Sequence, residues 1–190
     1  MYPTTDGFDE WNPTSFTCWS SKDLVKWKYE KIILDFPKDL TWAKERAWAP
    51  AIAQKNGKYY YYFVAEANIG VAVSDKPTGP FKDALGKPLV KKGMLRGQMI
   101  DPMVFVDDDG AAYLYFGQGG CYMVKLADDM ISYDPTKIIS FKLKGYNEGA
   151  FVFKRLGKYY LMWSEYDTRD PRLFCGLCHF KRSFGAVCKS

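Results

Sequence analysis

Short apolar runs rich in aromatic and β-branched residues recur along the chain, and turn residues separate them. Runs of this kind, joined by Gly-containing turns, predict β-strands connected by hairpins. The clearest turns are Asn56-Gly57, Asp109-Gly110 and Leu156-Gly157, while helical periodicity is limited to one turn over 38–46. The expected strands are 58–66, 68–75, 103–108, 111–117, 121–127, 149–155 and 158–165. The pattern therefore predicts an all-β chain.

One unit of this pattern occurs three times, as WAPAIAQKNGKYYYYF, IDPMVFVDDDGAAYLYF and NEGAFVFKRLGKYYLMW. Each copy has a small apolar run, then Gly57, Gly110 or Gly157, then an aromatic run. Short-strand repeats about 50 residues long are typical of the blades of a β-propeller. A β-sandwich also uses short strands and turns, but the repeated Gly and acidic positions favour the propeller.

Two of the copies open with an acidic residue at what looks like the same place. Asp101 and Glu148 each precede the Gly of their copy by the same number of residues, and Ala49 stands near that place in the third copy. Equivalent positions in the blades of a propeller face one central axis, so the repeat predicts two carboxyl groups in one site. Paired carboxyl groups are what acid/base cleavage of a glycosidic bond requires.

Composition and charge argue against a nucleic-acid-binding or membrane-spanning protein but do not indicate a particular function. The 190 residues suffice for one domain, and the net charge of +5 comes from 27 basic and 22 acidic residues that are interleaved along the chain. No basic run resembles a nucleic-acid patch, and no apolar stretch has the length of a membrane-spanning helix. Residues 1–11 lack the regions of a signal peptide, and a secreted, periplasmic or cytoplasmic location all stay open.

The segment 16–34 looks like the outer part of an earlier blade. Residues 20–24 would form a strand end and a turn, with Trp27 as an apolar anchor. The chain would then begin inside this blade and hold about three blades plus pieces. A propeller interrupted in this way has unpaired strand edges, so we expect marginal folding and aggregation.

These stretches together resemble glycoside hydrolase family 43. The segments SSKDLVKW, RAWAPAIAQKNGKYYYYF, IDPMVFVDDDGAAYLYF and NEGAFVFKRLGKYYLMWSE carry the resemblance, which covers roughly residues 2–172. It implies a five-bladed β-propeller that hydrolyses arabinose- or xylose-containing oligosaccharides or polysaccharides of plant type. The implied reaction is an inverting acid/base mechanism that needs no organic cofactor.

The resemblance also implies roles for the two acids. Glu148 matches the general acid, and Asp101 matches the residue that orients the substrate and raises the pKa of the acid. The third family acid, the general base, has no match here, and neither Asp6 nor Asp9 is assigned to it. The chain alone is therefore expected to be inactive or nearly so. A non-catalytic, carbohydrate-binding propeller fragment is the alternative.

Other residues receive weaker assignments. Trp48, Arg46 and Gln118 are candidates for binding the sugar, and core packing is an equally good interpretation of Trp48. The run 107–110, DDDG, lacks the spacing of a calcium-binding loop and predicts a hairpin turn, so no metal site is expected.

The segment 173–190 breaks the pattern. It holds Cys175, Cys178, Cys188 and the single His179, and CGLCH formally matches a c-type haem attachment motif; a zinc or redox site is a weaker alternative. We favour a reading-frame shift near Arg172 over an ordinary divergent tail, because codons compatible with this tail give AYSVAYATSKEALGPFAKV after a one-base shift. That sequence alternates like a strand and resembles 70–82. The expected organisation is a partial propeller domain over 1–172 and an out-of-frame, poorly packed tail over 173–190.

Overall fold

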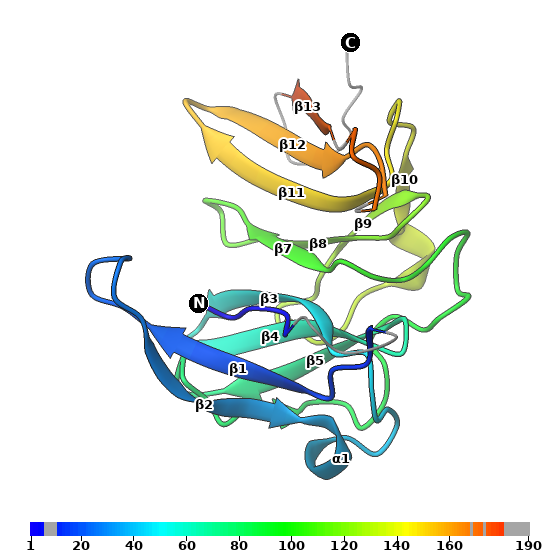
Figure 1. Ribbon diagram of the computed structural model, residues 1–190. Coiled ribbons are helices and arrows are strands. Elements are labelled where there is room, and N and C mark those ends of the chain that lie inside the picture. The colour runs from blue at the N-terminus through cyan, green and yellow to red at the C-terminus, as the bar shows by residue number, and fades with distance from the viewer. Residues whose placement is uncertain (6–10, 168, 173, 181–190) are drawn as a thin grey trace. The chain divides into compact units, whose positions relative to one another are not determined.

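The structure is a computed structural model that describes residues 1–5, 11–167, 169–172 and 174–180. Strands dominate it, which confirms the predicted all-β class (Figure 1). The helical turn expected over 38–46 is present only as α1 (Phe36–Asp39), and η2 (Pro135–Lys137) is a short 3₁₀ turn. The strands are β1 (Ser15–Ser20), β2 (Lys28–Asp35), β3 (Trp48–Lys55), β4 (Lys58–Ala65), β5 (Asn68–Ser74), β6 (Lys82–Asp83), β7 (Met103–Val106), β8 (Ala112–Phe116), β9 (Cys121–Lys125), β10 (Ile139–Phe141), β11 (Glu148–Arg155), β12 (Lys158–Ser164) and β13 (Cys175–Phe180).

The described strands form antiparallel sheets in which neighbours in sequence are neighbours in space. The sheets are β1-β2, β3-β4-β5-β6, β7-β8-β9-β10 and β11-β12-β13. This meander order, with up to four strands per sheet, is that of propeller blades. The chain divides into two compact units, Met1–Lys92 and Gly93–Ser190, which are described separately below.

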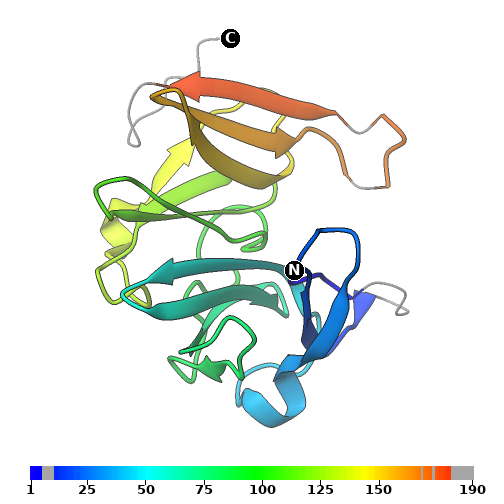
Figure 2. The same cartoon turned by 90° about the vertical axis from the view of Figure 1, so that its left-hand side faces the viewer.

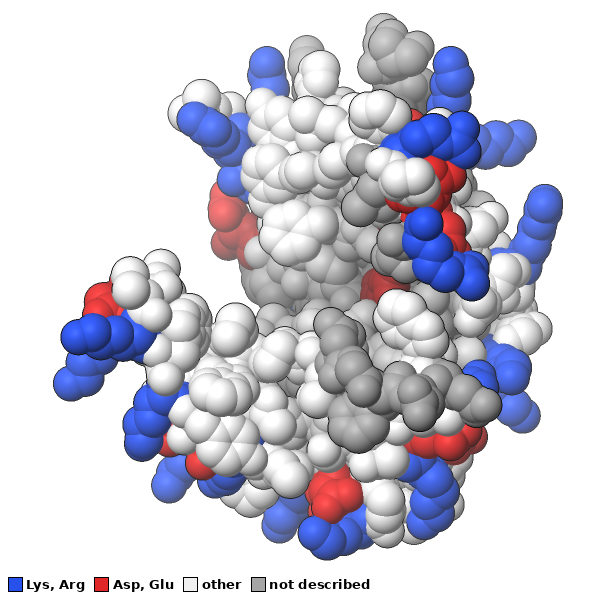
Figure 3. Space-filling view, viewed as in Figure 1, with Lys and Arg blue, Asp and Glu red and all other residues white. Residues whose placement is uncertain are grey.

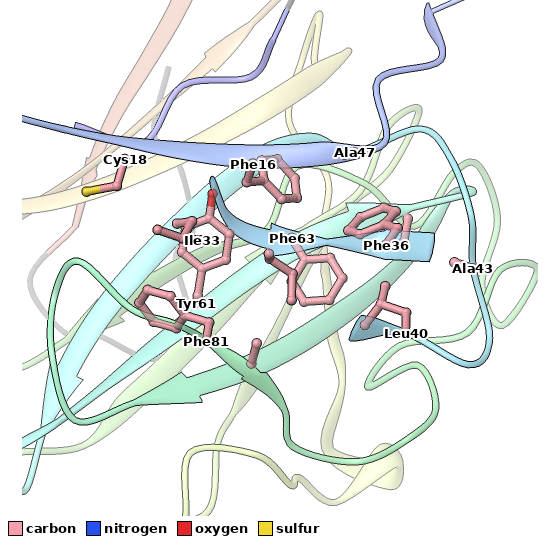
Figure 4. Packing of buried hydrophobic residues seen from close by; sticks show 13 residues of the cluster. Phe16, Cys18, Ile33, Phe36, Leu40, Ala43, Ala47, Tyr61, Phe63 and Phe81 are labelled. Atoms are coloured by element: carbon pink, nitrogen blue, oxygen red, sulfur yellow. The ribbon is translucent and has the colours of Figure 1, made fainter. Parts of the chain in front are cut away.

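In the first unit the β1-β2 sheet packs against the β3–β6 sheet through aromatic side chains (Figure 4). Phe16 and Cys18 alternate along β1 with more exposed neighbours and so bury one face of the strand. Phe16 meets Tyr61 of β4 edge to face, with ring centroids 5.3 Å apart. The prediction that Trp27 is an apolar anchor is wrong, because its side chain is exposed. Among the described residues of this segment, Trp19 of β1 instead contacts Tyr29 of β2, with ring centroids 5.1 Å apart.

In the second unit the β7–β10 and β11–β13 sheets share one buried cluster, which includes Tyr115, Leu161 and Trp163. Polar contacts also join these sheets, because the Asp107 carboxylate accepts hydrogen bonds from Tyr159 Oη at 2.6 Å and Lys154 Nζ at 3.2 Å. The Gly110 amide donates to the Asp107 carbonyl at 2.9 Å, which confirms the predicted hairpin turn.

The start of the tail is better packed than its sequence suggested. β13 pairs with β12 in the second unit, and Figure 2 shows the two strands side by side. Cys178 and Phe180 are each only 7% exposed, so the expectation of poor packing is wrong for 175–180. Residues 173 and 181–190, the rest of that expected tail, lie outside the described residues.

The β13 geometry also bears on the haem-like motif. Side chains alternate along the strand, with Cys175 exposed and Cys178 buried. Residues three apart in a strand point to opposite faces of the sheet. The strand therefore does not present the two thiols to one ligand, as attachment through a CxxCH motif requires.

β13 has the same register as β5, with a glycine opposite an aromatic residue of the neighbouring strand. We therefore expect substitution of this glycine to destabilise each unit. Gly70 lies opposite Phe63, and Gly176 lies opposite Trp163. A Cβ atom at either glycine would overlap the aromatic ring across from it. We expect Gly70→Val and Gly176→Val each to lower the free energy of unfolding by about 1–3 kcal/mol, the usual result of overpacking.

Urea denaturation of the two variants checks this expectation. Leu177→Val is the matched control, because Leu177 is 59% exposed on the other face of β13. Unchanged unfolding midpoints in both glycine variants would contradict the register described for these strands.

Candidate active site

A left-handed residue at the start of the first strand of each repeated sheet shapes the backbone around the candidate acids. The residues concerned are Ala49 (φ 43°), Asp101 (φ 54°) and Gly149 (φ 69°). In the β3 and β11 sheets a register shift falls at this point, between Trp48 and Ala51 and between Glu148 and Phe151. Such a shift re-aims the side chains next to it.

The register corrects the predicted equivalence of the two acids. Ala51 of β3, Met103 of β7 and Phe151 of β11 are the first residues paired with the next strand after this point. Counting back from them, Asp101 corresponds to Ala49 and Gly149, whereas Glu148 corresponds to Trp48. The Gly-based alignment failed because the β7-β8 hairpin is one residue longer, closing with the Asp107 amide on the Ala111 carbonyl at 2.8 Å.

The two acids nevertheless lie together in the second unit. The Gly149 amide, directly after Glu148, donates to Asp101 Oδ2 at 3.0 Å. Burial raises the pKa of Asp101 to about 6, repulsion from Glu148 acts in the same direction, and the Gly149 hydrogen bond opposes both. The Asp101 carboxylate thus holds the backbone next to Glu148 in place and interacts with the Glu148 carboxyl group through its charge.

Glu148 is half-buried, and its pKa is raised mainly by that burial. The hydrogen bond that Gln118 Nε2 donates to Glu148 Oε2, at 2.7 Å, lowers its pKa. Asp167 raises the pKa of Glu148 and Arg169 lowers it through their charges. The upward direction is the one that the sequence predicts. Burial is the largest cause of the raised pKa at both carboxyl groups, ahead of the repulsion between Asp101 and Glu148 on which the sequence-based expectation rested.

Several neighbours of the acids were missed by sequence reasoning. Tyr146 Oη donates to the Gly117 carbonyl at 2.7 Å, and burial raises the pKa of Tyr146 far above its usual range, with contributions from both acids. Asp167 and Arg169 are paired at 2.7 Å and border an open polar cavity of about 570 Å³. The alternating charges in the sequence DTRDPR were the available signal for this charged segment beside Glu148.

The remaining candidates belong to the first unit. The guanidinium of Arg46 lies over the ring of Trp48, 5.8 Å from its centroid. Trp48 Nε1 donates to the Trp11 carbonyl at 2.7 Å, and Arg46 Nε donates to Asn12 Oδ1 at 3.4 Å. Trp48 is partly exposed, so it is not a fully buried core residue.

The described residues hold no helix long and apolar enough to cross a membrane. Within the same ranges, no group of three His, Cys, Asp or Glu side chains could hold a metal ion. On the face seen in Figure 3, basic and acidic side chains are interspersed and do not form a single basic patch.

Comparison with known proteins adds to this geometry. The sequence profile of a family described as glycosyl hydrolases family 43 matches residues 1–181. A β-D-galactofuranosidase of Aspergillus niger is 35% identical over 179 residues, which cover 86% of this chain and 52% of the relative. The chain thus spans about half the length of that relative.

Solved structures agree in fold. An α-L-arabinofuranosidase from Clostridium thermocellum superposes with a TM-score of 0.80 at 37% identity, covering 94% of this chain and 61% of that one. An enzyme of the family from Xanthomonas citri superposes with a TM-score of 0.80 at 26% identity, and the match covers 97% of this chain and 67% of that one. The sheets described above are thus part of a five-bladed β-propeller. With these matches, the chain belongs to glycosyl hydrolases family 43.

Proposed function

We propose that this chain carries the acid half of the active site of a glycoside hydrolase that acts on arabinose- or xylose-containing oligosaccharides or polysaccharides. The observation that carries the proposal is the carboxyl pair Asp101 and Glu148, joined through the Gly149 amide at 3.0 Å. Burial raises the pKa of both carboxyl groups, which is the state a proton donor needs near neutral pH. Relatives named as xylosidase/arabinosidase and arabinoxylan arabinofuranohydrolase supply the sugar class.

The proposed reaction is hydrolysis with inversion. Glu148 gives its proton to the glycosidic oxygen as the bond to the sugar breaks, and water attacks from the opposite face. Because Gln118 donates to Glu148 Oε2, the other oxygen, Oε1, is the one that carries the transferred proton. The base must stand about 6.5–9.5 Å from the acid to leave room for the water. We assign no residue of this chain to that role, and Asp6 and Asp9 lie outside the described residues.

The other candidates take supporting roles in this proposal. Asp101 holds the backbone after Glu148 through the Gly149 amide. Gln118, first expected to bind sugar, orients the acid instead, since its amide nitrogen is engaged by Glu148. Trp48 and Arg46 are proposed to contact a sugar, because a partly exposed Trp ring suits the apolar face of a pyranose or furanose. The proposed domain includes β13, since the family match extends to 181.

The alternative is a non-catalytic, carbohydrate-binding protein, which the lack of an assigned base favours. In the deciding experiment, the full-length protein is incubated with arabinosyl- and xylosyl-oligosaccharides, and the products are followed by ¹H NMR. Release of a pentose whose first-formed anomer is inverted is the expected result. Saturable binding without release would support the binding protein, and a retained anomer would overturn the inverting mechanism.

A further inference from the structure

We propose that Gln98 is a positioning residue for the acid Glu148, acting through the side-chain amide of Gln118. This inference rests on the proposed function, because it concerns how the acid is held for proton transfer. It concerns the segment 97–98 before β7, which no candidate role has included so far.

A continuous chain of hydrogen bonds joins the three side chains. Gln98 Nε2 donates to Gln118 Oε1 at 2.6 Å, and Gln118 Nε2 donates to Glu148 Oε2 at 2.7 Å. All of these groups lie in the second unit. The Gln118 amide is thus held at both ends, by a donor on one side and a carboxyl acceptor on the other.

The backbone holds Gln98 in register with Gln118. The backbone amide of Gln98 donates to the backbone carbonyl of Gln118 at 3.1 Å, and the backbone amide of Gln118 donates to the backbone carbonyl of Gln98 at 2.9 Å. Gly97, with φ 84°, makes this approach possible, because a Cβ atom there would overlap the Gln118 carbonyl oxygen. The backbone pairing therefore places the exposed side chain of Gln98 next to that of Gln118.

The orientation of the Gln118 amide decides what it does to the acid. With its NH₂ group toward Glu148 it donates to Oε2 and leaves Oε1 free to carry the proton toward the substrate. Turned over, it would present its oxygen, which accepts the proton of the acid and favours the protonated form. Gln98 supports the first orientation, because its NH₂ group then donates to the Gln118 oxygen that points away from Glu148.

Other charged and titratable groups face Glu148 and set the background against which this effect is measured. Asp101 comes from the segment before β7, and Tyr146 from the segment before β11. Asp167 and Arg169 come from the segment after β12. None of them belongs to the Gln98–Gln118 pair. A change confined to Gln98 therefore leaves these four groups in place.

The test replaces Gln98 and measures the pKa of Glu148 by ¹³C NMR of its carboxyl carbon in the chain itself. Gln98→Glu puts an acceptor where the donor stood, so Gln118 turns its NH₂ group toward residue 98 and its oxygen toward Glu148. We expect the pKa of Glu148 to rise by about one unit. Gln98→Met, which removes the donor without adding charge, should raise it less. Gln54→Glu on β3, exposed and in the other unit, is the control and should leave it unchanged.

A double-mutant cycle separates orientation from simple charge. In a Gln118→Met background the effect of Gln98→Met should vanish and that of Gln98→Glu should shrink to its charge contribution. No shift in the single variants, or equal shifts in both backgrounds, would overturn the inference.

Turnover supplies an independent reading. In the protein as its gene encodes it, Gln98→Glu should move the basic limb of the pH–rate profile upward and lower kcat with little change in KM. A shifted pKa in a protein without hydrolase activity would leave the positioning inference standing and sink the proposed function. Full activity with no shift in the pKa of Glu148 would do the reverse.

Discussion

Glu148→Gln is expected to slow hydrolysis of unactivated arabinosyl or xylosyl glycosides by about 10²–10⁴-fold, the usual contribution of a positioned general acid. Gln has the shape of Glu148 but no proton to transfer. It can still accept the hydrogen bond that Gln118 donates at 2.7 Å, so the surrounding contacts survive. The loss should appear in kcat, measured as pentose release by the protein as its gene encodes it.

The dependence on the leaving group separates acid catalysis from other effects of the substitution. A dinitrophenyl glycoside needs little protonation to depart, so Glu148→Gln should hydrolyse it at close to the parent rate. Glu30→Gln is the matched control, because Glu30 is a hydrogen-bonded carboxylate of the first unit, 3.1 Å from Lys28. Equal losses on activated and unactivated substrates would indicate damage to folding or binding, and an unchanged rate on both would remove Glu148 from the acid role.

The strands and hairpins could be predicted from the sequence because their signals are local. The aromatic runs of β4, β8 and β12, and turns such as Asn56-Gly57, need only the alternation of side chains and a residue that tolerates positive φ. β13 was missed because its composition is unusual. Its alternation of Gly176, Cys178 and Phe180 on one face nevertheless gives it a buried side.

The presence of a carboxyl pair could be predicted from the sequence, but its alignment and its hydrogen-bonding neighbours could not. Asp101 and Glu148 were recognised as a pair, yet their alignment was one residue out, because the length of the β7-β8 hairpin cannot be read from a Gly position alone. The hydrogen bond from Gln118 to Glu148 could not be predicted, since side-chain hydrogen bonds depend on register across strands. Gln98, Asp167 and Arg169 lie in irregular segments that carry no repeated pattern.

Asp101→Asn is expected to stabilise the protein at neutral pH while impairing the acid. The native pKa of Asp101 is raised to about 6 from an ordinary 3.8, so the native state holds this proton more tightly than the unfolded chain does. Stability from this group is fully present below the unfolded pKa and is lost as pH rises from about 4 to 6. A shift of this size corresponds to about 3 kcal/mol of unfolding free energy. Asn never ionises, so the variant should escape that loss.

Urea denaturation at pH 4 and at pH 7 checks this expectation. The parent should lose stability between the two values, and Asp101→Asn should lose less, with the largest gain over the parent at pH 7. The difference between the two proteins reports the titration of Asp101 together with its coupling to Glu148, which titrates in both. An identical slope in parent and variant would show that Asp101 is not the group whose protonation stabilises the native state.

The catalytic cost divides into a charge effect and a hydrogen-bond effect. Asn can still accept from the Gly149 amide, whereas Asp101→Ala leaves that amide without its 3.0 Å partner. Coupled carboxyl groups raise one another's pKa, so removing the Asp101 charge should lower the pKa of Glu148 and move the basic limb of the pH–rate profile down in both variants. Only Asp101→Ala should also lower the pH-independent kcat, because the backbone that aims Glu148 is released. Equal kcat values in the two variants would reduce the role of Asp101 to its charge, and an unmoved basic limb would reduce it to its hydrogen bond.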